Sequence, residues 1–298
     1  MKDKKVRKKY LIELEETRSI VALAASILIF IFALAAVLVM ALQYDETQVF
    51  PLQYYTVLSN LLTAVTAAMM IPYAVEGIRK KRFVLPRWVV VLQYASATSI
   101  AITMIASLTV IWPVMGSTTV TGTGFWLHVF VPVCNVILFQ CVETGVNFTW
   151  RDTILAEIPF WIYTTVYLIE VAIIGEENGG WEDIYMVKTQ PSVWIPLIAI
   201  LALGFGIAVL LRVIQNKHSE QSRKRITGLW KEKPGRTELL IEAFGLGRYY
   251  GSVYSYGELS IPLDIFTLMS EWYEIPLEDM TKAYMKGALD AMNERRGS

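Results

Sequence analysis

Six long apolar runs constrain this chain more than any other feature of its sequence. They lie near residues 19–43, 54–76, 88–112, 125–146, 153–174 and 193–214. A bilayer core about 30 Å thick needs roughly 20 helical residues, because each residue advances a helix by about 1.5 Å. Each run reaches that length, and hydrophobic residues make up 54% of the 298 residues. The sequence therefore predicts an all-α fold, a six-helix polytopic transmembrane bundle.

Basic residues are concentrated on one side of the predicted membrane. They cluster before the first run, between the second and third runs, and after the sixth run. The three loops on the opposite side contain a single basic residue, Lys188. Because Lys and Arg near span ends stay in the cytoplasm, we expect a multi-pass protein of the cell membrane with cytoplasmic N- and C-termini. The basic clusters also suit anionic lipid headgroups, and we expect no nucleic-acid partner.

Composition divides the chain into four parts. These are a basic cytoplasmic N-terminus (1–18), a six-span transmembrane domain (19–215), a basic juxtamembrane linker (216–236) and a small C-terminal cytoplasmic helical unit (237–298). The last unit is marginal in size for independent stability. We expect it to dock on the membrane domain or on a protein partner.

Within the helical unit, two helix starts are predicted. Proline suits the first position of a helix, so the segments at 260–264 and 276–279 each read as a helix start. After the second start, apolar side chains at helical spacing predict a buried face, formed by Leu277, Met280, Tyr284, Ala288 and Ala291. The glycines and tyrosines between Phe244 and Leu259 are expected to interrupt any helix there.

Polar side chains are costly inside a bilayer, so each is a candidate functional group. From the predicted topology, Thr56, His128 and Glu170 all lie within about one helical turn of the outer surface. Asn60 follows Thr56 by four residues and shares its helix face. Three spans thus bring a hydroxyl, an imidazole and a carboxylate to one layer of the membrane.

Two short motifs carry a family resemblance. The pattern YT-x-x-SN-x-L occupies residues 55–62, and the pattern H-x-x-x-P occupies residues 128–132. Together they resemble the androgen-induced and androgen-dependent (TFPI-regulating) multi-span membrane hydrolases and their bacterial relatives. The animal members of that family hydrolyse fatty acid esters of hydroxy fatty acids. The resemblance spans about residues 20–215 and implies that Thr56 is the nucleophile and His128 the base.

The chemistry of these residue types fits that role. Threonine is a weak nucleophile that needs an adjacent base, and histidine has the proton affinity for this task. Glu170 is the acidic residue predicted at the same depth and could orient the imidazole. Asn60 or Tyr55 could donate to an oxyanion. No cluster of His, Cys and Asp residues suggests a metal, so we expect neither a metal nor another cofactor.

Each candidate also has a structural interpretation. Thr56 could simply hydrogen-bond a backbone carbonyl one turn earlier, as threonines in membranes often do. His128 could be a packing residue at the interface, and Glu170 could face the headgroups. Glu157 and Glu143 lie near cytoplasmic span ends, so we expect both to be solvated.

The sequence therefore predicts an intramembrane hydrolase that cleaves a lipid or fatty-acyl ester entering from the outer leaflet. Its expected partners are membrane lipids and a lipid-like acyl substrate. One alternative is a non-catalytic membrane protein that binds a lipid or a partner. Another is a small-solute transporter, which is less favoured because no charged residue is predicted near the bilayer midplane.

Overall fold

The computed structural model describes residues 2–45, 49–80, 83, 85–142, 147–185, 187–188, 192, 194–228, 236–253, 266–267, 270 and 275–296. The chain forms two compact units, Met1–Ser219 and Glu220–Ser298. Across the described residues the regular structure is helical and includes no strand. The first unit is the membrane domain, and the second contains most of the predicted linker together with the helical unit.

Within the described ranges, six helical stretches are long and apolar enough to cross a membrane, namely Glu16–Leu42, Tyr55–Lys80, Arg87–Ile111, Gly122–Cys141, Trp150–Ile174 and Leu197–Ser219. Each overlaps one of the six runs predicted from the sequence, which confirms the all-α transmembrane bundle.

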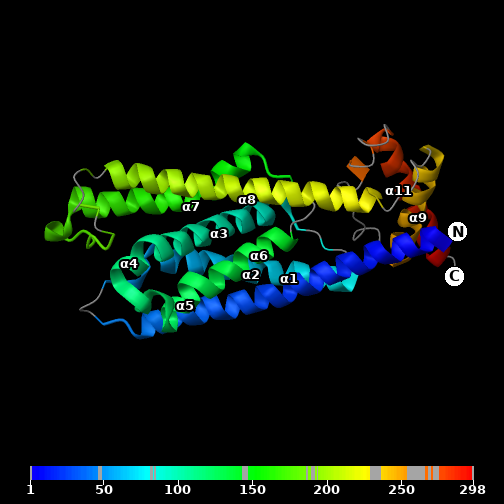
Figure 1. Ribbon diagram of the computed structural model, residues 1–298. Helices are drawn as coiled ribbons and strands as arrows, with labels where there is room; N and C mark the ends of the chain where they lie inside the picture. Colours follow the sequence, from blue (N-terminus) through cyan, green and yellow to red (C-terminus); the bar gives the residue numbers. More distant parts are fainter. Residues whose placement is uncertain are drawn as a thin grey trace. The chain divides into compact units, whose positions relative to one another are not determined.

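The helices of the membrane domain are drawn in Figure 1. They are α1 (Lys2–Leu42), α2 (Tyr55–Lys80), α3 (Arg87–Ala106), α4 (Trp112–Met115), α5 (Gly122–Phe125), α6 (Val131–Val142), α7 (Trp150–Leu168) and α8 (Trp194–Gly228). Three π-helical turns continue or join them, namely η2 (Ser107–Ile111), η4 (Trp126–Phe130) and η5 (Ile169–Ile174). Short 3₁₀ turns are η1 (Pro51–Gln53), η3 (Gly116–Val120) and η6 (Glu176–Asn178).

Two helices continue further than the predicted domain bounds. Helix α1 begins at Lys2, so much of the basic N-terminal segment extends the first membrane helix. Helix α8 continues to Gly228, so the first part of the predicted linker is helical. We call the end of the membrane domain that contains η1, η3 and η6 the distal end. The opposite end, which contains Lys80 and Arg87, is the basic end.

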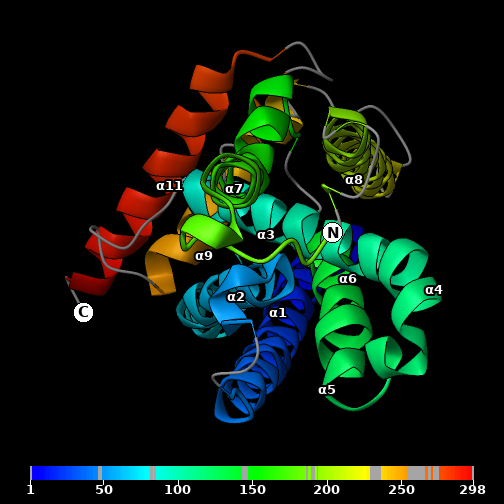
Figure 2. The same cartoon turned by 90° about the vertical axis from the view of Figure 1, so that its left-hand side faces the viewer.

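Helix α3 is the centre of the membrane domain. It packs against α2, α6 and α7, and it is the most deeply buried of the six spans. Viewed along the bundle, α3 lies between α7 and the layer formed by α1, α2 and α6 (Figure 2). Because lipid is as apolar as leucine, polar side chains on such a helix are stabilised by bonding to neighbouring helices.

Small residues let α1 and α2 approach closely. A Cβ added at Gly77 would lie 2.5 Å from the Oγ of Ser19, so glycine leaves space for the Ser19 side chain at this crossing. Alanines continue the contact, with Ala22, Ala33 and Ala36 on α1 and Ala64, Ala67 and Ala74 on α2 all buried. Close backbone approach through small residues is the usual basis of helix association in membranes.

The helical unit is built on two crossing helices, α9 (Arg236–Val253) and α11 (Leu277–Arg296). The helix start predicted at 276–279 is confirmed, whereas the one at 260–264 lies outside the described residues. The expected break after Phe244 is wrong, because α9 runs through Gly247 and Gly251. A Cβ at Gly247 would overlap the carbonyl oxygen of Tyr284, so glycine is needed for close packing there. Tertiary packing outweighs the low helix propensity of glycine.

Candidate functional site

His128 is held by a hydroxyl group from a neighbouring span. Its Nδ1 lies 2.6 Å from the Oγ of Ser107, and either atom could be the donor. Ser107 is buried, with 1% of its surface exposed, and His128 is half-buried. When Nδ1 carries the ring proton, Ser107 accepts the bond and Nε2 has a free lone pair. Among the described residues, Nε2 has no hydrogen-bond partner.

Ser107, His128 and Glu170 all lie in π-helical turns at the distal end. Ser107 begins η2, His128 lies in η4 and Glu170 lies in η5. A π turn places an extra residue in the helix and so changes the direction of the side chains around it. Such turns are rare and are frequent at functional sites. Three different spans therefore depart from α geometry in the layer where the sequence predicted a site.

The Asn60 amide links the segment of Thr56 to the segment of His128. Its Nδ2 donates to the carbonyl oxygens of Thr56 at 2.8 Å and of Leu127 at 3.2 Å. Leu127 directly precedes His128, so both segments contact the same amide group. These bonds use both N–H groups of Asn60. In this conformation Asn60 therefore has no free donor for the oxyanion role expected from the sequence.

The hydroxyl group of Thr56 differs from those of neighbouring membrane threonines. Thr66 and Thr103 each donate to the carbonyl four residues earlier, at 2.8 and 3.2 Å. Thr56 is in the first turn of α2, which begins at Tyr55, so no carbonyl of α2 lies one turn before it. Within the described part of the chain, its Oγ1 bonds neither such a carbonyl nor His128. Thr56 as a whole is buried, with 9% of its surface exposed, and its hydroxyl remains available.

Tyr55 packs toward α7. Its ring centroid lies 5.3 Å from that of Phe160 and 5.0 Å from that of Tyr163. Its backbone N–H donates to the hydroxyl of Tyr185 at 3.1 Å. Burial raises the pKa of Tyr185, so this phenol stays neutral and can accept the bond. The Tyr55 side chain thus packs against α7 and not against His128.

Asp183 fixes the distal loop that carries Tyr185. The hydroxyl of Tyr167 donates to its Oδ1 at 2.8 Å, and the backbone N–H of Val187 donates to the same oxygen at 2.9 Å. The N–H of Lys188 donates to Oδ2 at 2.7 Å. A carboxylate that accepts several such bonds orders the backbone around it. The loop therefore holds the Tyr185 hydroxyl against the start of α2.

Glu170 does not reach the imidazole in this structure. It is half-buried, and its backbone carbonyl accepts the N–H of Gly175 at 3.0 Å. Across the described residues its carboxyl group makes no hydrogen bond or ion pair. The position expected for Glu170, beside Nδ1 of His128, is occupied by Ser107.

A buried polar stripe follows one face of α3 and ends at Ser107. The Nε2 of Gln93 donates to Asn135 at 3.1 Å, and Asn135 donates to Ser96 at 3.0 Å. The hydroxyl of Thr103 lies 2.7 Å from that of Ser59. This stripe was not among the features predicted from the sequence. The sequence pattern that could have predicted it is the recurrence of polar residues every three or four positions through an otherwise apolar span.

The expectation for Glu157 is wrong. Its side chain has 0% of its surface exposed, although we expected solvation near the end of the span. Helix α7 turns this residue inward toward α3 and α8, and helix rotation cannot be deduced from depth alone. Glu143 lies outside the described residues.

Within the described residues, no group of three or more His, Cys, Asp or Glu side chains is arranged to hold a metal ion. Comparison of the chain with protein-family models, curated proteins and solved structures finds no match.

Proposed function

We propose that this membrane protein is an intramembrane hydrolase that cleaves a lipid or fatty-acyl ester at the distal end of the bundle. The observation that carries the proposal is the 2.6 Å contact between Ser107 Oγ and His128 Nδ1. An imidazole fixed through one nitrogen, with the other nitrogen free, is the arrangement of a general base.

In this mechanism His128 takes a proton through Nε2 while Ser107 accepts a hydrogen bond from Nδ1–H. Ser107 thus has the orienting role that an aspartate has in a Ser–His–Asp triad. Its complete burial suits a positioning residue better than a nucleophile, because a nucleophile must reach the ester carbon.

Thr56 is the proposed nucleophile. It corresponds to the nucleophile position of the hydrolase family that the motifs resemble, and its hydroxyl has no competing bond within the described part of the chain. The Asn60 bridge keeps its backbone beside the segment of His128. Thr56 would attack the ester carbon, transfer its proton to His128 and form an acyl-enzyme, which water then hydrolyses.

One observation favours a different nucleophile. Ser107 is the hydroxyl that actually contacts the imidazole, so a Ser107–His128 pair is the second candidate. The two assignments use the same base and the same reaction, and they differ in which side chain carries the acyl group.

We propose that the distal end faces the cell exterior and the basic end faces the cytoplasm. The support is the Lys and Arg distribution, since the loops at the distal end contain Lys188 as their single basic residue. The substrate would then reach the site from the outer leaflet.

The test is to treat purified protein in detergent with a long-chain fluorophosphonate and to locate the adduct by peptide mass spectrometry. We expect the adduct on Thr56, with loss of labelling in both Thr56→Ala and His128→Ala. An adduct on Ser107 would assign the nucleophile to that residue. If no hydroxyl is labelled and no ester in a broad panel is turned over, a lipid-binding membrane module is the better explanation.

A further inference from the structure

Glu157 is a buried acid that the proposed hydrolase does not use. Neither carboxyl oxygen has a hydrogen-bond partner among the described residues, and none of its surface is exposed. It lies about 10 Å along α7 from Trp150, the first residue of its span. An unpaired carboxylate is very unfavourable in such surroundings, so the buried group is retained as the neutral acid.

The surroundings of Glu157 leave room for the acid, and among the described residues no counter-charge pairs with its carboxyl group. The buried Arg212 of α8 instead donates to the Oγ1 of Thr153, one turn earlier on α7, at 3.4 Å. On α8, a Cβ added at Gly204 would lie 3.1 Å from Oε2 of Glu157, so glycine makes the space that the carboxyl group occupies. The Trp161 side chain, one turn along α7, approaches the carboxyl group without completing a hydrogen bond. The phenols of Tyr55 on α2 and Tyr94 on α3 are close enough to interact electrostatically with Glu157.

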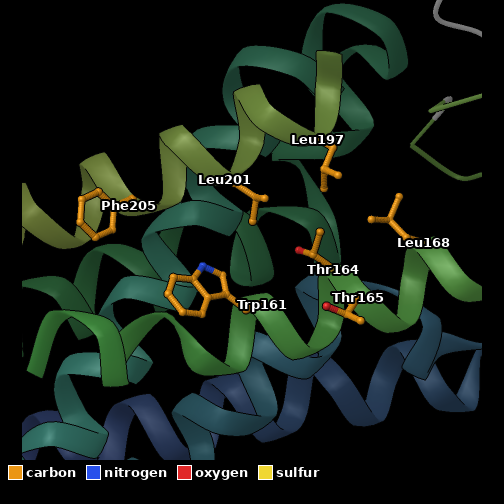
Figure 3. Close-up of a pocket in the computed structure, with 7 residues that line it drawn as sticks. All are labelled: Trp161, Thr164, Thr165, Leu168, Leu197, Leu201 and Phe205. Carbon is orange, nitrogen blue, oxygen red and sulfur yellow. The ribbon is translucent and has the colours of Figure 1, made fainter. Parts of the chain in front are cut away.

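A cavity of about 360 Å³ lies between α7 and α8 (Figure 3). Its lining residues are Trp161, Thr164, Thr165, Leu168, Leu197, Leu201 and Phe205. Trp161 follows Glu157 by one helical turn, and Phe205 directly follows Gly204. In Figure 3 these two aromatic side chains lie toward the same end of the cavity. The acid therefore adjoins the end of the cavity that Trp161 and Phe205 line.

We propose that Glu157 is a proton-binding site inside the membrane domain, one helical turn from the cavity between α7 and α8. The carboxylate takes up one proton to form the acid and releases the same proton on opening to water. A metal ion is a less suitable occupant, because the described residues include no group of three or more His, Cys, Asp or Glu side chains that could hold one. An acid of this kind is the group that proton-linked solute transport requires, and it acts independently of His128.

The experiment uses the full-length protein in detergent and dicyclohexylcarbodiimide, an apolar reagent that reacts with protonated carboxyl groups. Peptide mass spectrometry locates the adduct. We expect an adduct on Glu157 at neutral pH, and no adduct at this position in Glu157→Gln. The control variant Glu170→Gln should leave labelling of Glu157 unchanged, since Glu170 lies at the distal end of the same span.

Labelling of Glu157 should fall about tenfold for each pH unit above its titration midpoint, because only the acid reacts. Gly204→Ala should slow labelling several-fold, since its Cβ would lie 2.9 Å from Cε1 of Phe160 and close to the carboxyl group. Gly206→Ala is the matched control, as nothing lies within 4 Å of the added Cβ.

Two results would overturn the proposal. One is an unmodified Glu157 at neutral pH while other carboxyl groups of the protein are labelled. The other is protection of Glu157 by Na⁺ or K⁺ at constant pH, which would identify a metal cation as the occupant. Because the adduct is mapped in the wild-type chain, the outcome is clear even if Glu157→Gln expresses poorly. The labelling result is also independent of whether the protein hydrolyses an ester.

Discussion

Ser107 and His128 are joined across two spans at the distal end, with 2.6 Å between Oγ and Nδ1. Each lies in a π-helical turn, and Ser107 is buried while His128 is half-buried. This contact fixes the orientation of the ring and decides which nitrogen is free. The first prediction tests that contact directly.

Removing the Ser107 hydroxyl should release the imidazole. The chain has two histidines, so His218→Gln gives a protein in which ¹⁵N-histidine NMR reports on His128 alone. We expect the Nδ1–H tautomer in this background and a mixture of tautomers after Ser107→Ala. The exposed Ser117→Ala is the control and should leave the spectrum unchanged. An unchanged spectrum in Ser107→Ala would show that the hydroxyl does not orient the ring.

Thr56→Ala and His128→Ala should not have additive effects on ester hydrolysis. Each should lower kcat by about 10²- to 10⁴-fold, and the double variant should be no worse, because either change disables the shared step. Thermal stability should stay near that of wild type, since the Thr56 hydroxyl has no partner to lose within the described residues. Thr109→Ala, at an exposed hydroxyl in η2, should retain full activity. If the loss of kcat in the double variant equals the product of the two single losses, Thr56 and His128 do not act in one shared step.

The proposed orientation can be checked by cysteine labelling in intact cells. After replacement of Cys134 and Cys141, a cysteine at exposed Asn178 should react with an impermeant thiol reagent. A cysteine at exposed Arg79 should react only after the cells are opened. Labelling of position 79 in intact cells would show that the orientation is the opposite of the one proposed, with the site in the other leaflet.

The two glycines Gly245 and Gly247 of α9 should respond oppositely to alanine. At Gly247 the new Cβ would overlap the carbonyl oxygen of Tyr284, and overpacking of this kind costs about 1–3 kcal/mol. At Gly245 nothing lies within 4 Å, so alanine should stabilise the helix by about 0.5–1 kcal/mol. Hydrogen exchange of α9 and α11 in the full-length protein measures both effects. Equal effects at the two positions would argue against the close crossing.

The Arg248–Glu294 pair should make the end of α11 pH-sensitive. Arg248 donates to both carboxylate oxygens of Glu294, at 2.8 and 2.6 Å, and this bonding lowers the pKa of Glu294. A carboxyl group whose pKa is lowered by folding stabilises the protein at pH values above its pKa in the unfolded chain, about 4.3. This stabilisation is lost as the pH falls through the pKa of the folded state.

Hydrogen exchange near residue 294 should therefore increase on acidification in wild type and change less in Glu294→Gln. The effect should be small and weaken with salt, because both groups are exposed. An equal increase in both proteins would exclude the ion pair as its cause.

The sequence by itself determined the class of fold. Run length fixes the spans because the bilayer has a set thickness, so all six predicted runs correspond to observed membrane helices. The apolar face beginning at Leu277 was also predictable, since Met280, Tyr284, Ala288 and Ala291 follow helical spacing and are buried. Periodicity and length are local properties, and the sequence carries them completely.

The tertiary structure decided what lies beside what. Depth along a span can be predicted, but rotation about the helix axis cannot, and it turns Glu157 inward while Ser107 replaces Glu170 beside His128. The same holds for Gly247, where propensity predicted a break and close packing against Tyr284 required a helix. In each case the deciding term is a contact between residues far apart in the chain, which no local pattern contains.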